Sequence, residues 1–321
     1  MKTLKIIAAL LLVSYNGVHS QETSKKKQAK TYAEISVKED GKWEGRKYIG
    51  GTFKNVNSLR VADEHTDHSF DIRYEGPGWE SDKVGYRLYL DWRNAIDIFG
   101  KVTDTMVLHK VGLDGFESYH HMSPWGMDIL KAGKSLGIGA IGRYNGTEVL
   151  HFNQVDSTFA RVDNSPKSSD VTVRYKGWQT AGDKIDFESK LSISPGQRYT
   201  KHTIKASKKI EGICTGIVSF KDIALVKKES TNKKWAYIAT YGMQTLNNDK
   251  LGMAIFYETN TVSQQVKGPH DHLLIFKPAT KPVTFYFLGA WEKEKNGITT
   301  ETEFYNYLDT KLAELNKAGK I

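Results

Sequence analysis

Two adjacent histidines are the residues of this sequence best suited to proton transfer. His120 and His121 lie in the segment Gly112–Lys131, GLDGFESYHHMSPWGMDILK, in what we expect to be a loop just before a helix. A histidine has an ordinary pKa of about 6.5, so its imidazole can act as a general base or a general acid near neutral pH. The same segment contains Tyr119, Trp125, Asp128 and Lys131. The alternative is that both histidines are incidental surface residues.

A second segment combines arginines, carboxylates and aromatic residues. It spans Tyr74–Asp97 and reads YEGPGWESDKVGYRLYLDWRNAID. If residues 86–93 form a β-strand, alternate side chains share one face. That face would carry Arg87, Tyr89, Asp91 and Arg93. Two arginines with a carboxylate between them could grip the carboxylate of a ligand. The alternative is a solvated face of paired charges.

Two further histidine pairs have spacings that are compatible with metal ligation. They are His65 with His68, and His270 with His272. Three histidines and one carboxylate would suffice to bind a divalent metal ion. Hydrogen-bonded surface histidines are the simpler interpretation of each pair, and the sequence leaves any metal site unknown.

Several common kinds of site are excluded. No H-E-x-x-H, P-loop or EF-hand pattern occurs. Gly137–Gly142 matches G-x-G-x-x-G, but a helical segment precedes it and a turn follows it, which is the wrong context for a dinucleotide. We interpret these glycines as allowing close backbone approach at a strand. The single cysteine, Cys214, excludes an internal disulfide, a cysteine-based zinc cluster and an iron–sulfur site.

The net charge of +9 on 321 residues first suggests a nucleic-acid partner, but much of the excess lies near the N-terminus. Residues 1–20 have a basic start, a short apolar run and a Val-His-Ser end, as in a secretory signal peptide. Residues 21–30 are lysine-rich and predict a disordered tether. The remaining body has no run of three or more basic residues interleaved with aromatic residues. We therefore expect an exported protein, periplasmic or secreted, with an anionic ligand, no nucleic-acid partner and no membrane span.

The elements that must position these residues read mainly as β-strands. Residues 171–175, 184–193, 235–241 and 282–288 alternate with period two, and turn residues recur at roughly ten-residue intervals. Only residues 125–135 and 300–318 read as helices; the second begins with a capping-box spacing of Thr300 and Glu303. Without an internal repeat or linker, residues 31–321 predict one β domain, a sandwich or a barrel.

Residues 74–101 and 111–142 resemble a family of exported bacterial proteins that are encoded in polysaccharide-utilisation loci and described as a domain of unknown function. The resemblance extends over essentially the whole chain after the signal peptide. One branch of that family is assigned as an oligosaccharide dehydratase in ulvan degradation. The resemblance implies a single catalytic domain, a large antiparallel β-sandwich of the sugar-mutarotase kind with a few short helices and a C-terminal helix.

The implied reaction removes water across C4–C5 of a saturated uronic acid at the non-reducing end and leaves a 4,5-unsaturated uronate. A base takes the C5 proton, an acid protonates the departing 4-hydroxyl, and a cation stabilises the charge that develops beside the carboxylate. We assign the base to His120 or His121, with His120 as the main group, and the acid to Tyr119 or Tyr241. Substrate contacts are assigned to Arg87, Arg93, Asp91, Trp79, Trp125 and Arg143.

This chemistry requires no cofactor, although a divalent metal is compatible with it. The expected partner is a uronate-bearing oligosaccharide, with or without sulfate. A polysaccharide lyase on a uronate-containing glycan needs the same base and the same charge neutraliser, so the sequence is compatible with a lyase too. It is also compatible with a non-catalytic sugar-binding protein and with a mutarotase-like protein.

Overall fold

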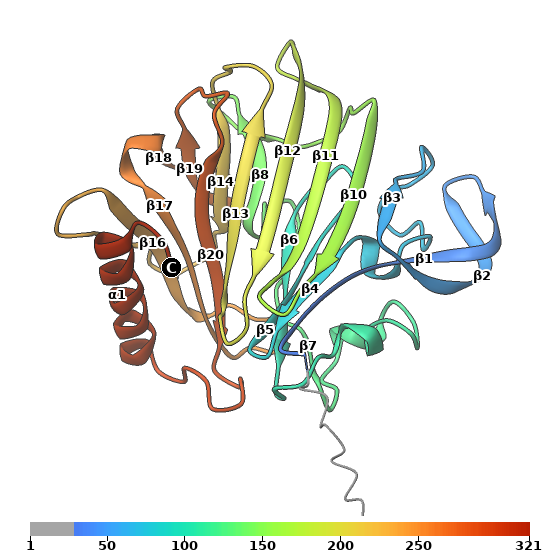
Figure 1. Ribbon diagram of the computed structural model, residues 1–321, viewed down its shortest axis with the longest axis horizontal. Coiled ribbons are helices and arrows are strands. Elements are labelled where there is room, and N and C mark those ends of the chain that lie inside the picture. The colour runs from blue at the N-terminus through green and yellow to red at the C-terminus, as the bar shows by residue number, and fades with distance from the viewer. Residues whose placement is uncertain (1–28) are drawn as a thin grey trace, which may run out of the picture.

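Residues 29–321 form three antiparallel β-sheets and a C-terminal α-helix in the computed structural model (Figure 1). The prediction of a mainly β, sandwich-like architecture with a C-terminal helix is confirmed. The predicted signal peptide, residues 1–20, and nearly all of the predicted tether, residues 21–30, lie outside the described residues.

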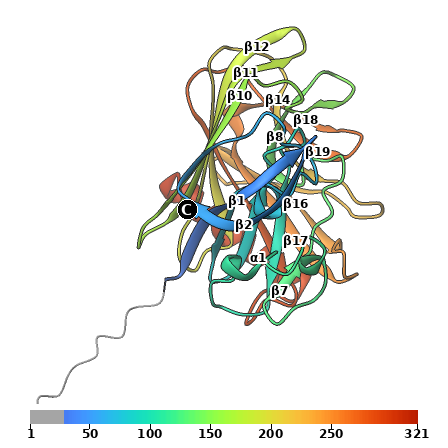
Figure 2. The same ribbon diagram turned by 90° about the vertical axis from the view of Figure 1, so that its right-hand side faces the viewer.

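The first sheet carries most of the residues with candidate chemical roles. Its six strands follow the order β2-β1-β4-β5-β6-β7. They are β1 (Thr31–Glu44), β2 (Lys47–Val56), β4 (Gly78–Ser81), β5 (Val84–Leu88), β6 (Ile96–Lys101) and β7 (Gly126–Asp128). The hairpin of β1 and β2 projects from the side of the molecule opposite the C-terminal helix (Figure 1), and Figure 2 shows it from that side.

The second sheet is the largest, with nine strands in the order β15-β16-β17-β20-β13-β12-β11-β10-β3. In chain order they are β3 (Ser58–Arg60), β10 (Ser157–Asn164), β11 (Ser169–Thr180), β12 (Asp183–Ile193), β13 (Tyr199–Ala206), β15 (Val226–Glu229), β16 (Trp235–Met243), β17 (Lys250–Glu258) and β20 (Val283–Trp291). These strands include the four period-two segments predicted from the sequence.

The third sheet has five strands in the order β18-β19-β14-β8-β9. They are β8 (Ile138–Tyr144), β9 (Val149–Leu150), β14 (Ile213–Val218), β18 (Val262–Lys267) and β19 (Asp271–Phe276). Four short 3-10 turns complete the described elements: η1 (Arg73–Glu75), η2 (Leu108–Lys110), η3 (Ser118–His120) and η4 (Thr259–Thr261). The glycine-rich segment lies on β8, where Gly139 packs directly against the ring of Phe287, as a close approach requires.

The nine-stranded sheet packs face to face against the two smaller sheets. The core between these layers is aliphatic and aromatic, and it draws buried side chains from all three sheets. Tyr86 of β5 stacks on Trp79 and meets Phe287 of β20 edge to face. Alternation along β5 therefore turns Tyr86 into the core and its neighbour Arg87 to the opposite face of the first sheet.

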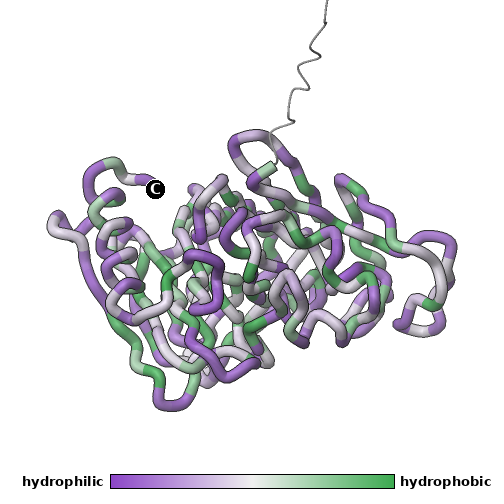
Figure 3. Tube along the Cα trace, turned by 90° about the horizontal axis from the view of Figure 1, so that it is seen from below, coloured by the Kyte–Doolittle hydropathy of each residue, from purple (hydrophilic) through white to green (hydrophobic). Residues whose placement is uncertain are grey.

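The C-terminal helix α1 (Glu301–Ala318) covers the outer face of the nine-stranded sheet. Thr300 and Glu303 form the predicted capping box, and Gly319 ends the helix with a φ of 71°. Phe304, Leu308, Leu312 and Leu315 are buried against the sheet. Figure 3 shows both hydrophilic and hydrophobic residues along this helix, as expected for an amphipathic helix. Within the described chain, no helix has the length and apolar character needed to cross a bilayer.

The prediction of a helix over residues 125–135 is wrong. This segment forms the short strand β7 followed by irregular chain. Gly126 has a φ of 130°, and a Cβ there would lie 1.8 Å from the carbonyl oxygen of Gly100 on β6. Pairing with β6 thus overrides the local apolar spacing, and His120 and His121 precede a strand rather than a helix.

Candidate active site

Three neighbouring strands bring one arginine and two carboxylates together on the outer face of the first sheet. Arg87 of β5 lies directly opposite Asp97 of β6. Asp128 of β7 pairs with Phe99, two residues along β6 from Asp97 and therefore on the same face. The antiparallel register thus joins residues that are up to 41 positions apart in the sequence.

Both terminal nitrogens of Arg87 are hydrogen-bonded within this group, which we call the Arg87 cluster: Arg87, Tyr89, Asp97, Tyr119 and Asp128. Its Nη2 atom donates to Asp128 Oδ2 at 2.7 Å, to Asp97 Oδ2 at 3.0 Å and to the Tyr89 hydroxyl at 2.7 Å. Its Nη1 atom donates to the Tyr119 hydroxyl at 3.0 Å. The residue is only 2% exposed. Arg87 therefore holds protein groups in place and offers no free guanidinium face for a ligand carboxylate.

Arg93 is engaged in a second group, the Arg93 cluster, formed by Asp67, His68, Glu75, Asp91 and Arg93. Its guanidinium makes ion pairs with Asp91, with Asp67 at 2.9 Å and with Glu75 at 3.1 Å. It also lies 3.9 Å over the ring of Tyr89, which connects the two clusters. Instead of a free cationic face, the predicted row of Arg87, Tyr89, Asp91 and Arg93 forms a partly buried network of paired charges.

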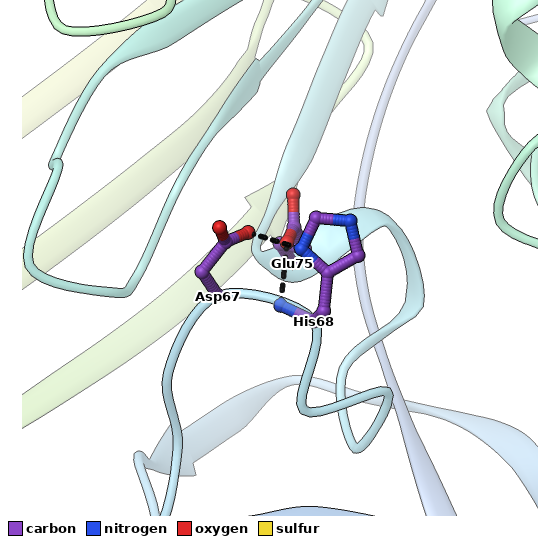
Figure 4. A group of neighbouring side chains, drawn as sticks. All are labelled: Asp67, His68 and Glu75. Atoms are coloured by element: carbon purple, nitrogen blue, oxygen red, sulfur yellow. Dashed lines mark hydrogen bonds and ion pairs between the residues drawn. The ribbon is translucent and has the colours of Figure 1, made fainter.

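The Arg93 cluster also contains three side chains close enough to share a metal ion. Single ligand atoms of Asp67, His68 and Glu75 lie within 4.8 Å of one another (Figure 4). Asp67 Oδ1 already lies 2.7 Å from His68 Nδ1, and Glu75 Oε1 accepts from the His68 backbone N–H. The guanidinium of Arg93 neutralises both carboxylates, so a divalent ion here would have to displace a partly buried cation. The donor set fits a metal poorly while Arg93 stays in place.

His120 lies at the edge of the Arg87 cluster. It ends η3, and its ring packs on Tyr119 with a centroid distance of 4.5 Å. Its Nε2 atom lies 3.6 Å from Asp128 Oδ2, just beyond hydrogen-bond range, and its buried Nδ1 has no hydrogen-bond partner among the described residues. Partial burial and the nearby charge of Arg87 lower the pKa of His120. The imidazole is therefore neutral and able to accept a proton at neutral pH.

The pKa of Asp128 is shifted in the opposite direction. Burial raises the pKa of Asp128 well above its ordinary value, with a further upward contribution from Asp97, while Arg87 opposes the shift. Burial is the main cause, because removal from water disfavours the charged carboxylate, and the neighbouring carboxylate adds to the shift. The neutral imidazole of His120 can therefore act as a base, and the carboxyl of Asp128, with its raised pKa, can act as an acid. Their two environments shift the two pKa values in opposite directions, as in other acid–base pairs.

A pocket of about 560 Å³ gives access to this pair. Its lining includes Arg87, Tyr89, Asp97, His120, His121, Asp128 and Lys131. Met122 and Leu246, both exposed apolar residues, also lie on its wall. The volume is typical of small-ligand sites, and the exposed Lys131 supplies a cation on the wall. We call this the His120 pocket.

The structure brings only some of the predicted site residues to the His120 pocket. His121 lies on its wall and is exposed. Tyr119 contacts Arg87 and His120, but it lines a neighbouring pocket of about 500 Å³ beside Glu75. Trp125 is half-buried and packs edge-on against Phe99.

Three other predicted residues lie elsewhere. Trp79 is fully buried, with its indole N–H donating to Thr200, so neither face can stack on a sugar. Tyr241 packs against Phe304 of α1, and its hydroxyl donates to the Thr299 carbonyl. Arg143 on β8 donates to backbone carbonyls and pairs with Asp183 at 2.7 Å. The last two side chains are held by structural contacts outside the His120 pocket.

The two spaced histidine pairs do not converge on one another. His65 is buried and bonded to Asp71, whereas His68 belongs to the Arg93 cluster. His270 is exposed just before β19, and His272 is buried within that strand. Neither pair therefore presents both imidazoles to a common centre.

Several residues of the pocket carry little or no signal in the sequence. Asp128 and Lys131 stand out there only as neighbours of the histidines, and Tyr89 only as part of an arginine-bearing face. Leu246 and Asn247 reach the pocket from the loop between β16 and β17. The run from Asn247 to Asp249 is one of the turn signals in the sequence, but nothing local indicates that it lines a pocket, because its place depends on the pairing of distant strands.

Comparisons with known proteins give one family match. A family model described as a domain of unknown function (DUF4861) matches residues 14–321. No curated protein matches the sequence.

Solved structures that resemble the chain include a 4-alpha-glucanotransferase from Thermococcus litoralis, with a TM-score of 0.33 and 11% identity, covering 70% of this chain and 38% of that one. Another is a candidate aldose 1-epimerase from Klebsiella pneumoniae, with a TM-score of 0.34 and 9% identity, covering 74% and 83% of the two chains. This chain thus spans well under half of the glucanotransferase. At these TM-scores neither resemblance establishes a shared activity.

Proposed function

We propose that this chain, which belongs to the family described as a domain of unknown function (DUF4861), is an oligosaccharide dehydratase. In this proposal it removes water across C4–C5 of a saturated uronic acid at the non-reducing end of an ulvan-type oligosaccharide and leaves the 4,5-unsaturated uronate. The observation that carries the proposal is the pairing of His120 with Asp128 beside one pocket, with their pKa values shifted in opposite directions. The sequence resemblance supplies the substrate class.

In the proposed reaction His120 is the general base. Its neutral imidazole takes the proton from C5, the electron pair forms the C4–C5 double bond, and the C4–O bond breaks. Asp128 protonates the departing hydroxyl, so one water molecule leaves. Because the two groups are 3.6 Å apart, they would act on the same side of the sugar ring. Asp128 takes the acid role that the sequence alone gave to Tyr119 or Tyr241.

The proposal divides the cationic groups between two roles. Lys131 is the exposed cation on the pocket wall, so it is placed to bind the uronate carboxylate. Arg87 lies at the base of the pocket, where its positive charge favours the negative charge that develops beside that carboxylate. These steps need no cofactor. The substrate would be met outside the cytoplasm if residues 1–20 act as a signal peptide.

The test is incubation with a uronate-terminated oligosaccharide of defined length. A dehydratase lowers the mass by one water, keeps the chain length and creates a conjugated uronate that absorbs in the ultraviolet. His120→Asn and Asp128→Asn should each lower kcat by at least about a hundredfold. The matched control is His109→Asn, which replaces an exposed histidine outside the pocket and should leave the rate unchanged.

The same experiment distinguishes the dehydratase from the competing functions. A polysaccharide lyase would shorten the chain, a mutarotase would change only the optical rotation, and a sugar-binding protein would change neither mass nor absorbance. Near-normal dehydration by folded His120→Asn would remove His120 from the proposed mechanism. Circular dichroism of each variant verifies that the fold is intact.

A further inference from the structure

A rigid turn holds an exposed tryptophan close to the proposed active site. The turn spans Asp91–Asn94, and its two ends are buried, with Asp91 7% and Asn94 2% exposed. Asp91 Oδ1 accepts from the backbone N–H of Arg93 at 2.8 Å, and the Asn94 side chain donates to the Ile141 carbonyl at 3.1 Å. Trp92, between these anchors, is 39% exposed. An indole kept in solvent by a hydrogen-bonded turn is a candidate binding residue.

Trp92 forms the ridge between two pockets on this surface. One pocket, of about 270 Å³, is also lined by Lys134, His151 and His270. The other, of about 280 Å³, is also lined by Asp63, Thr66 and Asp156. Trp92 and Asn153 line both. An apolar ring face is thus flanked on both sides by hydrogen-bonding and charged side chains.

The orientation of the Trp92 indole is fixed by a contact with His151. The His151 ring meets Trp92 edge to face at a centroid distance of 5.7 Å, and His151 Nδ1 is hydrogen-bonded to the Arg93 carbonyl at 2.8 Å. The backbone N–H of Phe152 donates to the Trp92 carbonyl at 3.0 Å. A pyranose ring has one apolar C–H face and a rim of hydroxyls, which matches a preoriented aromatic face with polar groups at its edges.

One loop borders both this surface and the His120 pocket. Lys131, Ala132 and Gly133 line the His120 pocket, and the next residue, Lys134, lines the first Trp92 pocket. Ala132 packs with Tyr89 in one small buried cluster. The segment of residues 131–134 therefore contributes lining residues to both the His120 pocket and the first Trp92 pocket.

We propose that Trp92 is an outer sugar-binding position, where a pyranose ring further along the same oligosaccharide stacks on the indole. The identity of that oligosaccharide rests on the proposed function. Asn153, Lys134 and His270 are placed to contact the hydroxyl, carboxylate or sulfate groups of the stacked ring. The position contributes affinity for longer chains and takes no part in the bond-breaking step.

The test compares Trp92→Ala on a uronate-terminated disaccharide and on a tetrasaccharide. We expect KM for the tetrasaccharide to rise about tenfold, with kcat and the disaccharide KM unchanged. Trp92→Phe keeps an aromatic face and should restore most of the affinity. The matched control is Phe159→Ala, which removes an aromatic residue with 40% exposure that lines neither Trp92 pocket.

Calorimetric binding of the tetrasaccharide to His120→Asn, with and without Trp92→Ala, separates this inference from the proposed function. If the wild type does not dehydrate the sugar, but Trp92→Ala weakens binding tenfold, the proposed function fails and the Trp92 position stands. If dehydration occurs and Trp92→Ala changes neither KM nor the Kd, the Trp92 position fails alone. Absence of binding to the intact site overturns the inference as well.

Discussion

At the residue scale, the most informative group is the guanidinium of Arg87. The sequence left open whether it binds a ligand carboxylate or pairs with carboxylates of the protein, and the fold buries it among the side chains of Asp97, Asp128 and two tyrosines. A buried cation shared by carboxylates fixes their positions and shifts their protonation. Arg87 therefore acts on the proposed chemistry mainly through Asp128 and His120, whose pKa values it lowers.

Replacing Arg87 should be costly to stability. Arg87→Met leaves two buried carboxylates without their cation, so we expect unfolding to become easier by about 3–5 kcal/mol, measured by urea denaturation. The control is Arg174→Met, which removes an exposed pair with Glu188 and should cost no more than about 1 kcal/mol. Equal losses in the two variants would contradict the structural role of Arg87.

The pH dependence of catalysis should be set by the protonation of the His120 imidazole. Because partial burial and Arg87 lower its pKa, the imidazole stays neutral below the ordinary histidine range. As the base must be neutral, kcat/KM should stay constant as pH falls toward about 6.5 and should decline only at lower pH. A pH–rate profile on the defined oligosaccharide measures this limb. A decline that begins above pH 7 would be inconsistent with His120 as the base.

At the scale of elements, the sequence predicted correctly those helices and strands whose conformation is decided by neighbouring residues, through capping and apolar periodicity. The helix over residues 300–318 has its own capping box and apolar stripe, and the structure contains it. The period-two strands of the nine-stranded sheet were predicted for the same reason. β7 was missed because pairing with β6 and the glycine at residue 126 decide its conformation, and its partner strand is not nearby in sequence.

The capping box of α1 gives a prediction at this scale. Thr300→Ala removes the side chain that accepts from the Glu303 backbone N–H, so the protein should lose about 1 kcal/mol of stability. Helix α1 covers the outer face of the nine-stranded sheet, and none of its residues lines the His120 pocket. The rate of dehydration should therefore be unchanged. Thermal unfolding and a rate assay measure the two effects. A variant that unfolds normally but loses activity would place α1 in the site.

At the scale of the whole molecule, the site depends on contacts that no short segment contains. Arg87, Asp128 and Leu246 come from three separate parts of the chain and meet at one pocket. The sequence could indicate that histidines, arginines and carboxylates were concentrated in residues 74–131. It could not indicate which carboxylates would pair with the arginines, that Trp79 would be buried, or that Tyr241 would lie against α1, because sheet register and layer packing decide each of these.

The stability of the folded protein should also depend on the protonation of one buried carboxyl group, that of Asp271, which lies outside the His120 pocket. Burial raises the pKa of Asp271 to about 7, and its Oδ1 accepts from the Leu136 backbone N–H. Because this folded-state pKa exceeds the unfolded value, protonated Asp271 supports the fold fully at acid pH. That support is lost as pH rises through about 7.

Asp271→Asn should therefore be more stable than the wild type at pH 8, by an amount on the order of 3 kcal/mol, with a smaller difference at pH 5. Melting curves at the two pH values measure it. The control is Asp222→Asn, which changes an exposed carboxylate and should show no such pH dependence. A wild type that is the more stable protein at pH 8 would rule out this account of Asp271.

Mass spectrometry of a defined, uronate-terminated oligosaccharide incubated with the wild type and with His120→Asn tests the central claim most directly. The account predicts that the wild type releases one water per chain without shortening it, and that folded His120→Asn leaves the mass unchanged. An unaltered mass with the wild type, or shortened chains, would contradict the dehydratase.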